Sequence, residues 1–217
     1  LSSDKLATDT VNISNTGAFS TSAAGSNVGY TLTVTGLTGA DADNYILAAN
    51  RTFSGSNGTI SQRALTITAN SATKSYDGQS WTGGNGVSYS GFATGEDVSV
   101  LNGTLTWGGT AQGARNAGNY TLSASGYISS NYSLNFVAGS LTVNKAALTL
   151  AAVSDTKVYD GNKTSAGTAV VGSLQGTDTI SRVRQEFVNQ NELGTGNSTL
   201  SVVSDASGYV INDGNSG

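Results

Sequence analysis

The chain has 217 residues, of which only 11% are charged, and its net charge is −4. It has 10 basic residues and no His, Cys or Met. It therefore offers no basic surface for phosphates, no imidazole zinc site, no thiolate nucleophile and no disulfide. No apolar stretch approaches the roughly 20 residues that span a membrane. We expect no nucleic-acid partner, no membrane insertion of this segment and no cofactor.

Apolar residues recur in short runs that alternate with small polar residues, and Pro is absent. Period-2 alternation of this kind indicates half-buried antiparallel strands. In chain order the runs are residues 30–34, 65–67, 105–107, 120–122, 132–136, 141–143 and 148–150. The best helical candidate, residues 185–193, matches an earlier part of the chain, and we expect it to form a strand and a loop instead.

Three Asn-Gly pairs predict tight hairpin turns, because Asn and Gly tolerate a positive φ. They are Asn57-Gly58, Asn85-Gly86 and Asn102-Gly103. Short strands at close spacing favour an all-β chain of small antiparallel β-sandwich modules, either Ig-like or β-grasp-like.

An internal repeat divides the chain. Residues 74–78 (Lys-Ser-Tyr-Asp-Gly) match residues 157–161 (Lys-Val-Tyr-Asp-Gly) at an offset of 83 (157 − 74). Residues 8–11 (Thr-Asp-Thr-Val) match residues 177–180 (Thr-Asp-Thr-Ile) at 169 (177 − 8), about twice that offset. The repeat predicts one complete module flanked by two partial ones.

The predicted modules are residues 1–63, the C-terminal part of one unit; residues 64–146, a complete unit; and residues 147–217, the N-terminal part of a third. At the second junction the strand at residues 141–143 is followed closely by the strand at 148–150. The few residues between them include no Gly or Pro. A link this short predicts modules arranged end to end in a stiff rod.

Several motifs resemble those of known repeat modules. The Tyr-Asp-Gly motif after an Ala-Leu-Thr strand is followed by residues 118–122 (Gly-Asn-Tyr-Thr-Leu) and 130–134 (Ser-Asn-Tyr-Ser-Leu). These features resemble the YDG and MBG repeats of large bacterial adhesins of the filamentous-haemagglutinin type, exported by two-partner secretion. The flanking modules resemble the YDG type, on residues 34–45 (Val-Thr-Gly-Leu-Thr-Gly-Ala-Asp-Ala-Asp-Asn-Tyr), and the middle module resembles the MBG type.

The resemblance implies a secreted segment at the bacterial cell surface, associated with the outer membrane, that supports adhesion, aggregation or biofilm formation. Its expected partners are neighbouring modules of the same long chain and surface glycans or proteins of host or bacterial cells.

The repeated motif itself is expected to be structural. In Tyr76-Asp77-Gly78 and Tyr159-Asp160-Gly161, Asp caps the backbone, Gly supplies a positive φ and Tyr packs at a strand end. A ligand contact is the alternative for both copies. The lysines Lys74, Lys145 and Lys157 lie near predicted strand ends, where an isopeptide cross-link is a weaker possibility.

Other candidate sites are aromatic or acidic. Trp81 and Trp107, with Tyr89, are the candidates for stacking on a sugar, although tryptophan is more often part of a core. Asp41, Asp43 and Asn44 are weak candidates for a calcium site, because their spacing lacks a full calcium-loop pattern. The acids Asp9, Asp97 and Asp178 occupy matching repeat positions, which favours turns over a catalytic carboxylate pair and argues against an enzyme.

Three functions are compatible with these patterns. The leading hypothesis is a structural stalk that holds a distal binding head away from the cell. The second is a module that binds glycans or another cell surface. The third is a filament-forming subunit that completes its open sheets with a neighbouring chain.

Overall fold

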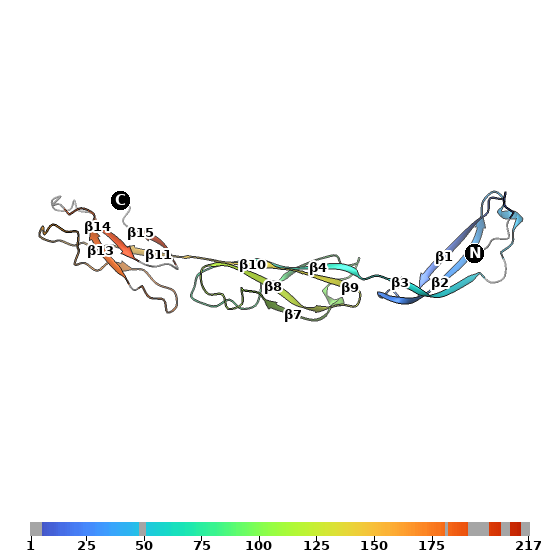
Figure 1. The fold of residues 1–217 in the computed structure, drawn as a ribbon, viewed down its shortest axis with the longest axis horizontal. Helices are drawn as coiled ribbons and strands as arrows, with labels where there is room; N and C mark the ends of the chain where they lie inside the picture. Colours follow the sequence, from blue (N-terminus) through green and yellow to red (C-terminus); the bar gives the residue numbers. More distant parts are fainter. Residues whose placement is uncertain (1–5, 48–50, 181, 191–199, 205–208, 214–217) are drawn as a thin grey trace. The chain divides into compact units, whose positions relative to one another are not determined.

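A computed structural model describes residues 6–47, 51–180, 182–190, 200–204 and 209–213. These residues form several small sheets and two short 3-10 helices, η1 (Ala42–Asn44) and η2 (Val98–Val100) (Figure 1). The all-β expectation is confirmed. No helix in this described part of the chain is long and apolar enough to span a membrane.

The first sheet is antiparallel throughout. Its strands are β1 (Asn12–Phe19), β2 (Gly25–Thr38) and β3 (Thr52–Ile60), in the order β1-β2-β3. Val28 and Val34 on β2 are its buried apolar residues among those described.

The middle of the chain contributes two sheets. One has the order β6-β4-β9 and the other β5-β10-β8-β7. The strands are β4 (Arg63–Ala69), β5 (Ala72–Ser75), β6 (Val87–Ser90), β7 (Asn102–Gly108), β8 (Gly118–Ile128), β9 (Tyr132–Val137) and β10 (Gly139–Asn144).

The last part of the chain forms a sheet in the order β12-β11-β15 and a separate pair, β13-β14. The strands are β11 (Ala146–Ala151), β12 (Val170–Val171), β13 (Val183–Phe187), β14 (Leu200–Ser204) and β15 (Tyr209–Asp213).

All seven alternating runs lie in strands, so the period-2 reading is confirmed. The expectation of antiparallel modules is met in part: β5 runs parallel to β10 and β11 runs parallel to β15, whereas the other strand pairs with a described register are antiparallel. Residues 185–187 belong to β13, as expected for a strand, while residues 191–193 lie outside the described residues.

The prediction of tight hairpin turns is wrong for all three Asn-Gly pairs. Asn57-Gly58 lies inside β3, where a Cβ on Gly58 would come within 2.6 Å of the Phe19 ring, so the glycine makes room for an aromatic side chain across the sheet. Asn102-Gly103 opens β7. Asn85-Gly86 lies between β5 and β6, which belong to different sheets. The expected positive φ is present at Gly86 (80°) and at Gly103 (84°).

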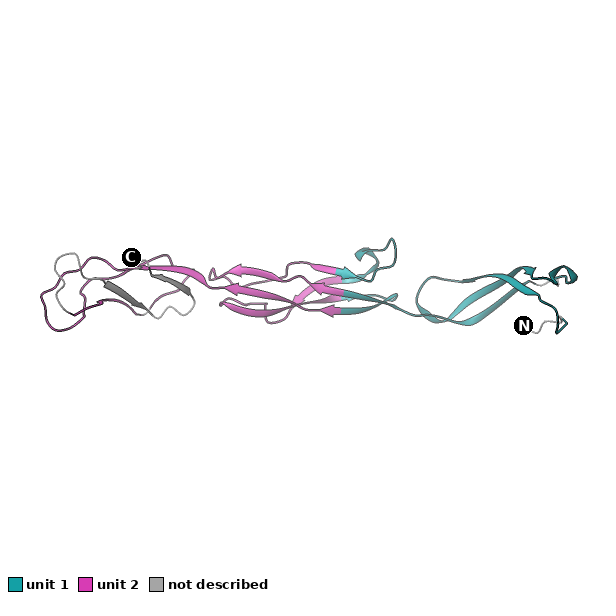
Figure 2. Cartoon of the chain, turned by 90° about the horizontal axis from the view of Figure 1, so that it is seen from above, with its two compact units in different colours: residues 1–66, 89–103, 127–135 teal, residues 67–88, 104–126, 136–217 magenta. Residues whose placement is uncertain are grey.

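The described chain forms two compact units (Figure 2). The first unit comprises residues 1–66, 89–103 and 127–135, and the second comprises residues 67–88, 104–126 and 136–217. The boundary between them passes through strands of the middle sheets. Strands β10 and β11 both belong to the second unit.

One residue, Lys145, separates β10 from β11. Along β10 the buried positions are Leu141 and Val143, and along β11 they are Ala146, Leu148 and Leu150. The alternation therefore shifts by one residue across the exposed pair Asn144 and Lys145, and the buried face of the strand changes side there.

The main core of the second unit continues through this junction. Its buried members are Tyr76, Ala111, Ala114, Leu122, Leu141, Val143, Ala146, Leu148 and Leu150. Each buried leucine contributes about 1.5–3 kcal/mol relative to exposure. Residues on both sides of Lys145 thus share one apolar cluster.

Candidate functional site

The first Tyr-Asp-Gly turn is held by an internal set of polar contacts. Lys74 Nζ lies 2.6 Å from Asp77 Oδ1 and donates to the Gln79 carbonyl at 3.1 Å. The same carboxylate oxygen accepts from the Gln79 amide at 2.9 Å, and Gly78 has a φ of 72°. The hydrogen bond from Lys74, followed by that from the Gln79 amide, lowers the pKa of Asp77.

The second turn has the same construction. Lys157 Nζ lies 2.7 Å from Asp160 Oδ1 and donates to the Asn162 carbonyl at 2.7 Å. Asp160 Oδ1 accepts from the Asn162 amide at 3.1 Å, and Gly161 has a φ of 77°. The hydrogen bond from Lys157 is the main reason that the pKa of Asp160 is lowered. Both lysines are therefore ion-paired within their own turns.

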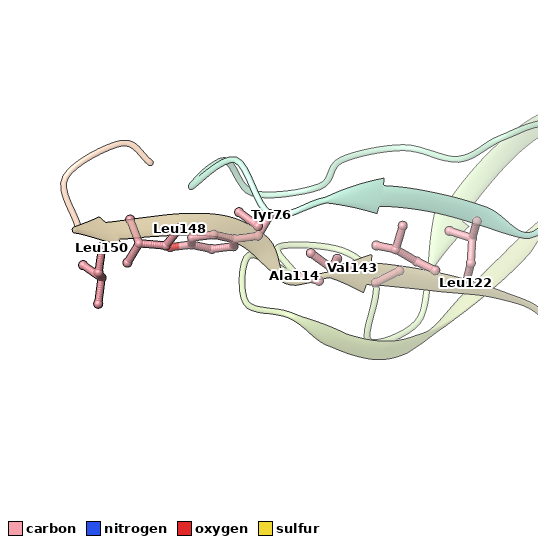
Figure 3. Close-up of a cluster of buried hydrophobic side chains, with 9 residues drawn as sticks. Tyr76, Ala114, Leu122, Val143, Leu148 and Leu150 are labelled. Carbon is pink, nitrogen blue, oxygen red and sulfur yellow. The ribbon is translucent and has the colours of Figure 1, made fainter. Parts of the chain in front are cut away.

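The tyrosines of the two turns differ sharply in exposure. Tyr76 is only 7% exposed. Tyr159 is 63% exposed, and its neighbour Val158 is 89% exposed. The Tyr76 amide donates to the Asn144 carbonyl at 2.7 Å, next to the strand junction. Figure 3 shows the Tyr76 ring reaching alongside Leu148 of β11.

The Tyr76 hydroxyl is hydrogen-bonded to a carboxylate that is distant in the sequence. It donates to Asp178 Oδ2 at 2.6 Å, and Arg115 Nη2 lies 3.2 Å from Asp178 Oδ1. A Cβ on Gly78 would lie 3.3 Å from Gly176 Cα, so the two glycines allow the backbones to approach closely. We refer to Tyr76, Gly78, Arg115, Gly176 and Asp178 as the joint. All five residues belong to the second compact unit.

Among the described residues, the kind of turn that contains Asp178 is found three times. The amide of the acidic residue donates to the carbonyl three residues earlier, with N···O distances of 3.1 Å for Asp9 to Leu6, 3.0 Å for Glu96 to Ala93 and 3.1 Å for Asp178 to Gln175. We call these the acidic turns. The sequence match between residues 8–11 and 177–180 is thus a match of local backbone structure.

A tyrosine completes two of the acidic turns. Tyr45 Oη donates to Asp9 Oδ2 at 2.7 Å and accepts from the Leu6 amide at 2.9 Å. Tyr132 Oη donates to a carboxylate oxygen of Glu96 and accepts from the Ala93 amide at 2.9 Å. The hydrogen bond to Glu96 raises the pKa of Tyr132.

The repeat position assigned to Asp97 is therefore wrong by one residue, because Glu96 occupies the place of Asp9 and Asp178. Asp97 instead caps η2, accepting from the Ser99 amide at 2.8 Å. Its hydrogen bonds to the Ser99 side chain and then to the Ser99 amide lower the pKa of Asp97. A one-residue shift between two adjacent acids could not be detected from the sequence.

The weak calcium candidates form a short loop. Asp41 Oδ2 accepts from the Thr10 amide at 2.8 Å, and the Asp41 amide donates back to the Thr10 carbonyl at 3.2 Å. Asp43 and Asn44 are exposed residues of η1. Among the described residues, no group of three or more His, Cys, Asp or Glu side chains is arranged to hold a metal ion.

The aromatic candidates do not form one group. Trp81 and Trp107 are partly buried against the core of the second unit. Trp81 Nε1 donates to the Gly83 carbonyl at 3.1 Å, and Trp107 lies so close to Gly84 that a Cβ there would be 2.2 Å from its ring. Tyr89 belongs to the first unit.

Tyr89 packs with other aromatic residues. Its ring centroid lies 5.5 Å from that of Phe92 and 6.4 Å from that of Tyr127. Its hydroxyl donates to the Tyr127 hydroxyl at 3.4 Å. Burial, followed by this hydrogen bond, raises the pKa of Tyr89 to about 12. The hydroxyl therefore stays protonated and acts as a packing and hydrogen-bonding group.

Two family models match the chain. Residues 1–52 match the YDG domain, and residues 65–142 match the MBG domain (YGX type). No curated protein and no solved structure matches. The chain contains a YDG domain and an MBG domain. The first acidic turn lies in the YDG match, and Tyr76, Glu96 and Arg115 lie in the MBG match.

Proposed function

We propose that this chain, with its YDG and MBG domains, is a structural stalk segment of a secreted bacterial surface adhesin. Its work is mechanical: it spaces a binding head from the cell and supports adhesion, aggregation or biofilm formation. The tandem arrangement of small β-sandwich modules, and the origin in a filamentous-haemagglutinin-like adhesin of the two-partner secretion type, are parts of this proposal.

The joint is the observation that carries the proposal. A stalk needs neighbouring segments that do not swing freely. Here a single residue, Lys145, links β10 to β11, and Tyr76 and Arg115 contact Asp178 beyond that link. A buried tyrosine that donates to a carboxylate is a directional contact, since charge-assisted hydrogen bonds are shorter and about twice as strong as neutral ones.

The acids and lysines that stand out in the sequence also serve the fold. Asp77 and Asp160 hold the Tyr-Asp-Gly turns, and Asp9, Glu96 and Asp178 hold the acidic turns. Side chains committed to repeated turns favour a mechanical role over catalysis.

A display experiment tests the proposal. The chain is placed between a cell-surface anchor and an epitope tag, and antibody access to the tag is compared with that given by a Gly/Ser linker of equal length. Such a linker is a flexible coil with an end-to-end distance of roughly 80 Å. A stalk gives greater access than the linker through the cell's surface polysaccharide. Equal access would contradict the proposal.

A binding module is the second candidate, on the aromatic group of Tyr89, Phe92 and Tyr127. The three residues are half-buried, so ring faces remain partly available to a sugar. A glycan array probed with the whole chain tests it: hits that vanish in Tyr127→Ala support binding, and an empty array sinks it.

A further inference from the structure

Residues 61–62 link β3 to β4, and this link is bound to the turn between β8 and β9. Gln62 Nε2 donates to the Ser130 carbonyl at 2.9 Å, across 68 positions of sequence. The Arg63 amide, at the start of β4, donates to the Asn131 carbonyl at 3.0 Å. The chain is therefore fastened on both sides of the point where β3 passes into β4.

One side chain of the β8–β9 turn also reaches the first sheet. Asn131 Oδ1 accepts from the Ala24 amide at 3.0 Å, across 107 positions of sequence. Ala24 directly precedes β2, in the connection from β1, where the Ala23 amide donates to Thr21 Oγ1 at 3.1 Å. Asn131 thus holds the link through its carbonyl and the β1–β2 connection through its side chain. All of these residues belong to the first compact unit.

The position of Asn131 is set by its own turn. The amides of Asn131 and Tyr132 both donate to Ser129 Oγ, at 3.2 and 3.1 Å. A serine that binds the amides following it stabilises a turn locally. Tyr132 is 3% exposed, and its hydroxyl is bound to the acidic turn of Glu96. The Asn131 oxygen is therefore directed by a turn that is anchored in a buried residue.

This contact differs from the joint in burial. Gln62, Ser130 and Asn131 are exposed, and Ala24 is half-buried. The apolar cluster that spans the β10–β11 junction has no member among the described residues before Ala72. An exposed hydrogen bond exchanges with water and contributes little net stability, whereas separating a buried cluster exposes apolar surface. The contact at Asn131 can therefore open while every strand stays folded.

We propose that Asn131 is the positioning residue of a second, weaker joint, in which its side-chain oxygen holds the β1–β2–β3 sheet to the β8–β9 turn. When this hydrogen bond opens, residues 61–62 become a hinge about which the sheet swings without unfolding. The chain then bends under a sideways load at residues 61–62 before it bends at Lys145, where the apolar cluster crosses the junction. The inference deepens the proposed stalk role and rests on it for its purpose, whereas the contacts themselves do not depend on it.

Spin labels test the proposal, because the chain has no Cys of its own. Thr16→Cys on β1 and Asn135→Cys on β9 give two exposed labelling sites in the first unit of the full chain. Pulsed electron paramagnetic resonance then measures the distribution of distances between the labels. We expect one narrow population in the labelled wild-type chain. In Asn131→Ala the ratio of closed to open molecules falls by roughly two- to twelvefold, the loss expected for one hydrogen bond, and a broad second population appears.

Two further variants show whether the side-chain oxygen is the cause. Asn131→Asp keeps an acceptor oxygen at the same place and should retain the narrow population. Asn102→Ala removes another exposed asparagine side chain of the same unit and should leave the distribution unchanged. A narrow distribution in Asn131→Ala, or a broad one in any of the other three labelled chains, would overturn the proposal.

Amide hydrogen exchange separates opening of the contact from unfolding of the sheet. In Asn131→Ala the Ala24 amide should exchange faster, while the Val34 amide, which donates to the Arg51 carbonyl at 2.8 Å, keeps its wild-type rate. Exchange at Val34 that rises in parallel would mean that the variant loosens the sheet itself, against the proposal. Failure at Asn131 leaves the joint at Asp178 and the stalk proposal standing. Equal antibody access in the display experiment overturns the stalk and leaves the Asn131 contact as measured.

Discussion

The two Tyr-Asp-Gly turns have nearly the same internal contacts and opposite surroundings. Lys74 and Lys157 bind their aspartates at 2.6 and 2.7 Å, and Gly78 and Gly161 have φ values of 72° and 77°. Yet Tyr76 is buried against the cluster that spans β10 and β11, and Tyr159 faces solvent. The motif therefore determines the turn, and the neighbouring acidic turn determines whether the tyrosine is covered.

The largest difference between the turns is expected on removing each ring. Tyr76→Ala deletes a buried aromatic side chain and is expected to lower the free energy of unfolding by about 3–5 kcal/mol. Tyr159→Ala, at an exposed position, is expected to stay within about 0.5 kcal/mol of wild type. Chemical denaturation followed by the fluorescence of Trp81 and Trp107 reports on the unit concerned. An equal loss of stability in the two variants would contradict the difference between the two turns.

The second largest effect is expected at Asp178, the carboxylate of the joint. Asp178→Asn keeps the shape of the side chain and removes the charge that faces Tyr76 and Arg115. We expect a loss of about 1.5–3 kcal/mol in the free energy of unfolding, the range for hydrogen bonds to charged groups. In a Tyr76→Phe background the same change should have a smaller effect, and a double-mutant cycle by denaturation measures the coupling. Full additivity would show that the two residues act independently.

Substitution of the glycines in the two turns distinguishes backbone strain from close packing. Gly78→Ala and Gly161→Ala both place a Cβ on a left-handed backbone, which is unfavourable by about 1–2 kcal/mol. A Cβ at residue 78 also meets Gly176 Cα at 3.3 Å, while nothing lies within 4 Å of one at residue 161. Thermal unfolding should show the larger loss for Gly78→Ala. The reverse order would mean that the joint does not hold the backbones close.

The smallest expected effect is a dependence on pH that the turns share. Because the pKa values of Asp77 and Asp160 are lowered in the folded chain, both carboxylates stabilise it above their ordinary value of 3.8. This stabilisation is lost as the pH falls below that value through the folded pKa. Asp160→Asn should therefore differ from wild type near neutral pH, and the difference should shrink as the pH falls below 3.8 through the folded pKa of Asp160, in unfolding curves at each pH. A stability difference that does not change with pH would show that the Asp160 charge is not its cause.

Local patterns were readable from the sequence, and long-range pairing was not. Alternation placed Leu65, Leu122 and Leu148 on strands, because a side-chain period of two is a property of neighbouring residues. The parallel pairing of β5 with β10 joins segments about seventy positions apart, and period-2 alternation is the same for either strand direction.

The sequence indicates some residues of the joint but not the contacts between them, for similar reasons. The repeat drew attention to Tyr76 and Asp178 separately, and no local signal linked them. Arg115 is a lone cation outside every repeat match, so nothing in the sequence distinguished it. Glu96 and its neighbour Asp97 look alike in the sequence, because adjacent acids differ only in the direction that each side chain takes from the backbone.

The parallel pairing of β5 with β10 has a mechanical consequence. Chain from the N-terminal side enters this sheet through β5, and chain toward the C-terminal side leaves from β10, its hydrogen-bonded neighbour. Tension applied along the chain would therefore slide the two strands past each other. In that geometry the hydrogen bonds between residues 72–75 and 141–144 stretch together and must break together, whereas a hairpin peeled from its open end would lose them one at a time.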